Sequence, residues 1–154
     1  MMRNENDKAK IELKVFAEFA SQANIGIDIS SAKKGDSNKH EPDISCEMVE
    51  GQVYFELAEA VAPELATEIT RIGKGSLPTP VWCDDVSTQT VSNKLKKLYA
   101  VSKPIELLIY TGERTTLPDD IIAAKLQLIL SNGLGRFRRV WLFGDSIQCI
   151  ANSS

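Results

Sequence analysis

The sequence has few of the residues that would point to several common kinds of site. It contains one histidine, His40, and an odd number of widely spaced cysteines, Cys46, Cys83 and Cys149, without a CxxC pair. This scarcity argues against a zinc site, a disulfide framework or a Ser-His-Asp triad. The GxxxxGK[ST] spacing of a phosphate loop does not occur either.

Long hydrophobic runs are missing as well. The N-terminal stretch MMRNENDKAK is polar, and no later apolar run approaches the roughly 20 residues that a membrane-spanning helix needs. We therefore expect a cytoplasmic protein with no membrane association. A strong excess of basic charge is also missing, because 18 lysines and arginines face 21 aspartates and glutamates. Any contact with DNA must therefore come from a local patch.

The composition that remains is that of one globular domain over residues 1–154. The chain is 43% hydrophobic and long enough to bury a substantial core, and we expect frayed ends at 1–8 and 151–154. Periodicity and turn residues predict an α/β fold. The expected elements are a helix over 8–23, a strand over 27–30, a loop over 31–42, a hairpin over 43–59, a helix within 61–73, a strand over 81–83, a helix from about 84 to 99, a buried strand over 105–110, a helix over 118–130, a strand over 137–143 and a last strand over 146–150.

The hairpin over 43–59 contains the candidate metal-binding carboxylates. If Glu50 and Gly51 form a tight turn, Asp43 lies opposite Ala58, and Glu56 becomes a diagonal neighbour of Asp43 on the same face, roughly 7–8 Å away. The opposite face is then entirely apolar, with Ile44, Cys46, Met48, Val53, Phe55 and Leu57. Two carboxylates and water suit Mg²⁺ or Mn²⁺, and such an ion holds a phosphate and activates water.

These residues resemble a known motif. Pro42-Asp43, then twelve residues, then Glu56-Leu57-Ala58 is similar to the PD-(D/E)xK motif of the restriction-endonuclease-like superfamily. The order of elements also resembles its core, a mixed central β-sheet with flanking helices (α-β-β-β-α-β), here followed by a helix and strands. The resemblance implies a Mg²⁺-dependent nuclease that hydrolyses phosphodiester bonds in DNA. It makes Asp43 and Glu56 metal ligands, often assisted by an acid on the first helix.

The chain departs from the motif at Ala58, where the superfamily has a lysine. Some members take this lysine from the following helix, where Lys94 lies closer than Lys96 or Lys97 to the apolar stripe, which makes it the substitute that we favour. Glu59 offers an ExxE variant, although strand alternation places it on the other face.

The first helix offers two candidate acids. Glu12 falls near the middle of the apolar stripe of that helix, and Glu18 falls near its edge. Because a carboxylate among apolar residues must be paired or metal-bound, Glu12 is the sharper candidate and Glu18 its backup.

Two basic groups are candidates for contact with DNA phosphates, namely Lys94 and Lys97 on one segment and Arg136, Arg138 and Arg139 on another. Because the motif lysine is missing, whether the chain is an enzyme stays open. Two alternatives remain: a catalytically silent binding or assembly module of the same fold, and a homodimer joined through the strand over 137–143.

Overall fold

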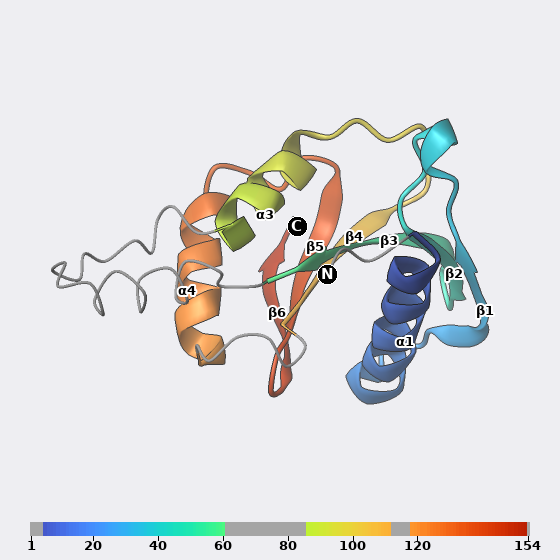
Figure 1. The fold of residues 1–154 in the computed structure, drawn as a ribbon, viewed down its shortest axis with the longest axis horizontal. Coiled ribbons are helices and arrows are strands. Elements are labelled where there is room, and N and C mark those ends of the chain that lie inside the picture. Colours follow the sequence, from blue (N-terminus) through green and yellow to red (C-terminus); the bar gives the residue numbers. More distant parts are fainter. Residues whose placement is uncertain (1–4, 61–85, 112–117, 154) are drawn as a thin grey trace, which may run out of the picture.

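Six strands form one mixed sheet in the structure, a computed structural model that describes residues 5–60, 86–111 and 118–153. The strands lie side by side in sequence order, β1 to β6 (Figure 1). The elements are α1 (Glu5–Ala23), β1 (Asp28–Lys34), the 3-10 turn η1 (Ser37–Lys39), β2 (Ile44–Met48), β3 (Gly51–Glu59), α3 (Val86–Lys96), β4 (Ile105–Tyr110), α4 (Asp119–Leu130), β5 (Phe137–Phe143) and β6 (Ile147–Asn152).

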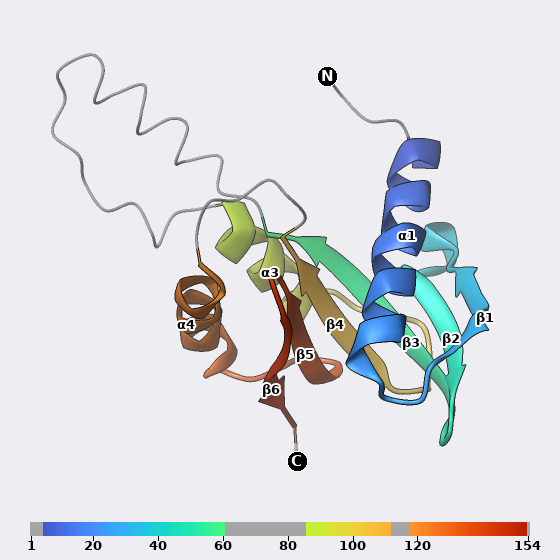
Figure 2. The same cartoon turned by 90° about the horizontal axis from the view of Figure 1, so that it is seen from below.

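The direction of the strands changes across the sheet. The first three strands form an antiparallel meander, β3, β4 and β5 run parallel to one another, and β6 is antiparallel to β5. A parallel step needs a crossover connection, and the segments from β3 to β4 and from β4 to β5 contain α3 and α4. Figure 2 shows α1 on one face of the sheet and α3 with α4 on the other.

Each face of the sheet has its own hydrophobic core. On the α1 face, the ring of Phe16 lies 5.0 Å from that of Phe55, and the ring of Phe19 lies 5.5 Å from that of Trp141. On the other face, the helices α3 and α4 pack on β3 to β6 with the buried residues Val91, Ile122, Ala123, Leu126, Leu130, Leu107, Ile109, Val140 and Leu142. The central strands are therefore covered on both sides, and any polar group that they carry inward must find a partner.

Most expected elements are confirmed, and the mixed α/β class is confirmed with them. The expected strand over 27–30 is longer, since β1 continues to Lys34, and η1 follows, so residues 31–42 are not one loop. Regular structure also extends further toward both ends, because α1 begins at Glu5 and β6 runs to Asn152. The elements expected within 61–73 and at 81–83 lie outside the described residues.

The expected register of the hairpin is wrong by two residues. Ile44 pairs with Phe55 and Met48 with Gly51, so Val49 and Glu50 form the turn, and Gly51, at φ 119°, begins β3. A shift by two keeps every side chain on its face, so the alternation in sequence fits either register. The apolar face is as expected, because its six residues are all buried: Ile44, Cys46, Met48, Val53, Phe55 and Leu57.

The structure bears on one form of the homodimer considered for the strand over 137–143, the form in which this strand pairs its backbone with that of a second copy. That strand is β5, which is hydrogen-bonded to β4 on one side and to β6 on the other. Its backbone groups are therefore already paired, and the edge strands of the sheet are β1 and β6. Among the described helices, none has the length and apolar character to cross a membrane.

Candidate active site

Glu56 is a fully buried carboxylate on the central strand β3, on the face that α3 covers. Its Oε2 accepts hydrogen bonds from Lys94 Nζ at 2.8 Å, Lys97 Nζ at 3.2 Å and the Tyr99 hydroxyl at 2.9 Å. Its Oε1 accepts the backbone N–H of Asp43 at 2.9 Å. These donors outweigh burial and hold the pKa of Glu56 below its usual value, so the side chain is an anion.

The last turn of α3 and the residues directly after it supply the three side-chain donors. Val91 anchors the helix in the core, and Lys94 lies in its last turn. The chain then turns, with Lys97 N–H donating to the carbonyl of Lys94, and Tyr99 packs its ring 5.8 Å from that of Phe137. Cations at a helix C-terminus are also favoured by the helix dipole. The expected helix to residue 99 ends at Lys96 because Tyr99 enters the core.

Asp43 lies directly before β2, and the observed register, continued by one residue, places it opposite Glu56. The two acids are locked together, because Asp43 Oδ2 accepts the N–H of Leu57 at 2.9 Å while Glu56 accepts the N–H of Asp43. Burial, then the charges of Glu56 and Glu12, raises the pKa of Asp43 to about 6, although Lys94 acts in the opposite direction. Ala58, expected opposite Asp43, is instead a core residue two positions further along β3.

Glu12 is the acid of α1 that the structure brings to this site. It is buried, and Lys34 at the end of β1 donates to its Oε1 at 2.7 Å. Its charge affects the pKa of both Asp43 and Lys94, so the three groups lie in one electrostatic cluster. The backup candidate Glu18 is exposed.

Lys94 is the lysine of this cluster that sequence reasoning selected. The carboxylates of Glu56 and Asp43 outweigh its burial and raise its pKa, so it stays protonated at neutral pH. Burial and the neighbouring Glu56 likewise raise the pKa of Tyr99. Both groups are therefore hydrogen-bond donors at neutral pH and not bases.

Glu59 pairs with Tyr110 at the end of β3, and strand alternation keeps it on the face opposite Glu56.

The fit of a divalent cation depends on Asp43 and Glu56. In the described part of the chain, no three His, Cys, Asp or Glu side chains are grouped closely enough to hold a metal ion. Two carboxylates completed by water are nevertheless a donor set that suits Mg²⁺ or Mn²⁺. Asp43 keeps capacity for such an ion, since only its Oδ2 accepts a hydrogen bond from the described residues, and nearby negative charge raises its pKa. An ion bound here would therefore have two protein ligands at most, Asp43 and Glu56, and would compete with the donors that Glu56 already has.

Two of the arginines expected to contact DNA, Arg138 and Arg139, pair in the structure with a second buried acid, Glu106, on the α1 face of β4. Arg138 Nε and an amino group of Arg139 donate to Glu106 Oε2 at 2.8 and 2.6 Å, and Trp141 Nε1 donates to Oε1 at 2.6 Å. A bulge in β5 brings the two consecutive arginines to the same carboxylate. Arg138 also pairs with Glu50 in the hairpin turn. These two arginines therefore neutralise a buried carboxylate of the fold, and their contact with DNA stays a prediction.

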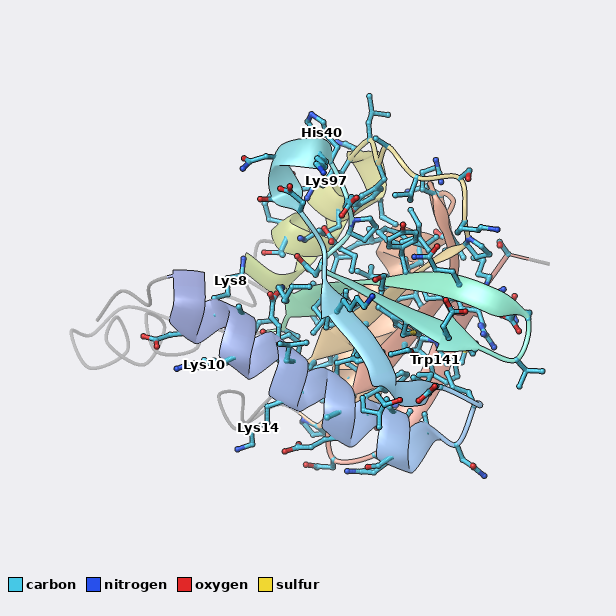
Figure 3. All side chains as sticks on the ribbon, turned by 90° about the vertical axis from the view of Figure 1, so that its right-hand side faces the viewer. Lys8, Lys10, Lys14, His40, Lys97 and Trp141 are labelled. Atoms are coloured by element: carbon cyan, nitrogen blue, oxygen red, sulfur yellow. The ribbon has the colours of Figure 1, made fainter. Side chains whose placement is uncertain are left out.

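Arg136 is exposed, but its guanidinium donates to the carbonyl of Val101 at 2.7 Å. The basic groups paired with the acids of the candidate site are lysines from the end of β1 and from the C-terminal end of α3 and the residue after it, namely Lys34, Lys94 and Lys97. Figure 3 shows Lys97 and His40 at the same end of the molecule, with Lys8, Lys10 and Lys14 along α1 and Trp141 well away from Lys97.

Sequence reasoning missed Lys34, Tyr99 and Glu106. Lys34 fell in a segment expected to be a loop, and Tyr99 was interpreted only as the end of a helix. Glu106 stands alone among the apolar residues of β4, and that isolation was the available signal of a paired, buried acid.

Comparison of the chain with protein-family models, with curated proteins and with solved structures finds no match. The function must therefore be argued from the geometry of the site.

Proposed function

We propose that the chain is a Mg²⁺-dependent nuclease of the restriction-endonuclease-like fold, acting on DNA. The observation that carries this proposal is the position of Lys94, whose Nζ lies 2.8 Å from Glu56 Oε2 although α3 supplies it. In this proposal, Lys94 takes the role of the lysine that the PD-(D/E)xK motif would have at position 58.

The topology supports the same proposal. The first helix, three antiparallel strands, a crossover helix and a parallel strand occur in the order of the superfamily core. Glu12 comes from the first helix, Asp43 from the residue directly before β2, and Glu56 from the middle of β3.

In this proposal, Asp43 and Glu56 hold the ion. A bound Mg²⁺ stabilises charge on phosphoryl oxygens and makes a bound water more acidic. Lys94, which remains protonated, orients Glu56 and adds positive charge where the phosphate gathers negative charge. Tyr99 and the Asp43 N–H fix the orientation of the Glu56 carboxylate.

The test is cleavage of plasmid and single-stranded DNA in Mg²⁺ or Mn²⁺. We expect Asp43→Ala and Lys94→Met each to lower the rate by about 10²-fold or more, the scale of a lost catalytic group. The control is Lys96→Met, an exposed lysine on the same helix. If wild type and Asp43→Ala are equally inactive under every condition, the nuclease proposal is wrong.

A catalytically silent binding module is the second candidate. The observation that favours it is the full occupation of Glu56, whose oxygens already accept four hydrogen bonds from the chain. Calorimetric titration with Mg²⁺ separates the two candidates. Metal binding that disappears in Glu56→Gln would exclude a silent site, whereas no binding in the wild type would support it.

A further inference from the structure

The candidate site is electrically balanced by its own side chains. The carboxylates of Glu12, Asp43 and Glu56 face three lysine ammonium groups, those of Lys34, Lys94 and Lys97. A divalent cation gains little attraction from a cluster whose charges already cancel. If one of the three lysines leaves, the remaining charges give a net negative site that favours the ion.

Of the three lysines, Lys97 can move away from its carboxylate with the smallest loss of interaction energy. Its side chain is 42% exposed, against 20% for Lys94 and 30% for Lys34, and its contact of 3.2 Å is the longest of the three. It follows the last residue of α3, so moving its side chain leaves the helix intact.

The bonding of Glu56 also singles out Lys97. Lys94, Lys97 and Tyr99 all donate to the same oxygen, Oε2. A carboxylate oxygen has two lone pairs, so three donors on it exceed its best capacity. Without Lys97, Oε2 keeps one charged and one neutral donor, and the buried carboxylate stays paired. The Lys97 ammonium also lies 5.3 Å from the centroid of the Tyr99 ring, and the Lys97 side chain itself is 42% exposed, so water can replace this contact.

We propose that Lys97 is an exchangeable counter-ion of Glu56, which occupies the cation position of the site until a divalent ion displaces it. This inference rests on the proposed metal dependence but does not depend on the reaction. Removing the charge of Lys97 should therefore strengthen metal binding, although a lysine beside a nucleic-acid site would ordinarily be expected to assist function.

The experiment is calorimetric titration of Mn²⁺ into the full chain at pH 7.5, where Asp43 is ionised, and at constant ionic strength. The variants are Lys97→Met and Lys97→Gln, both of which remove the charge. Lys96→Met is the matched control, because this exposed neighbour has no contact with Glu56 in the described structure. Circular dichroism verifies that each variant is folded.

We expect both Lys97 variants to bind Mn²⁺ about two- to fivefold more tightly than wild type, the range for releasing one partly exposed ion pair, with Lys96→Met unchanged. Equal or weaker binding in both Lys97 variants overturns the inference. Absence of binding in every protein overturns the inference and the proposed metal dependence together. Tighter binding by the Lys97 variants without DNA cleavage by any protein supports the inference and refutes only the nuclease proposal.

Discussion

Lys94, which is partly exposed, and the fully buried Glu56 form an ion pair of 2.8 Å between a crossover helix and the central strand of the sheet. The pair joins the two halves of the candidate site, since Glu56 is also bonded to the start of β2 through the Asp43 N–H. The Glu56 carboxylate therefore affects the stability of the protein, its pH dependence and any metal binding, and each of these properties can be measured separately.

Breaking this pair should destabilise the fold. We expect Lys94→Met to lower the free energy of unfolding by about 2–4 kcal/mol, because Glu56 stays buried with one cation fewer. Urea denaturation measures the change. Lys96→Met, an exposed change, should stay within about 0.5 kcal/mol of wild type. Equal stability of the two variants would mean that the pair contributes nothing to the fold.

Asp43 should make stability depend on pH. Its pKa is raised from 3.8 to about 6, so between these values the folded protein holds a proton that the unfolded chain has lost. Its contribution to stability therefore falls as pH rises from about 4 to 6 and is constant above that. The variant Asp43→Asn keeps an oxygen for the Leu57 N–H but cannot ionise. As pH rises from 4 to 7.5, we expect its free energy of unfolding to increase relative to that of wild type by on the order of 1 kcal/mol.

The measurement is the difference in unfolding free energy between Asp43→Asn and wild type at several pH values, since carboxylates remote from Asp43 cancel in the difference. A difference that does not change between pH 4 and 7.5 contradicts the raised pKa. Adding Mg²⁺ at pH 7.5 should stabilise wild type but not the variant if Asp43 is a ligand.

The Tyr99 hydroxyl should contribute to stability through Glu56. Tyr99→Phe keeps the ring against Phe137 and removes one donor to a buried anion, so we expect a loss of about 1.5–3 kcal/mol. Tyr54→Phe is the matched control, because the one bond of the Tyr54 hydroxyl to the described residues is a long contact of 3.5 Å with Gln52. Thermal denaturation should rank the control near wild type, and the opposite ranking would refute the role of the bond.

Glu106 should be a structural acid. Glu106→Gln leaves two arginines without their buried anion, and we expect a loss of about 3 kcal/mol or more in unfolding free energy. Glu47→Gln changes an exposed acid on β2 and should cost little. If Glu106→Gln is instead stable and binds DNA differently from wild type, the arginines are surface groups as the sequence first suggested.

Local pattern was enough to predict the helices over 8–23 and 118–130, the strands at 105–110 and 137–143, and both faces of the hairpin. Those features depend on periods of 3.6 and 2 residues, which neighbours in sequence define. The same reasoning placed Glu12 among apolar residues and selected Lys94 from its angle on the helix, and the structure brings both to the cluster around Asp43 and Glu56.

The sequence by itself determined which residues face inward, because alternation and helical periodicity are properties of the local chain. Only the tertiary structure decided the hairpin register, since registers two residues apart keep the same faces. It alone decided that three donors after Val91 converge on Glu56, and that Arg138 and Arg139 are committed to Glu106. Such pairings join residues more than thirty positions apart, and only the packing of helices on the sheet brings them within bonding distance.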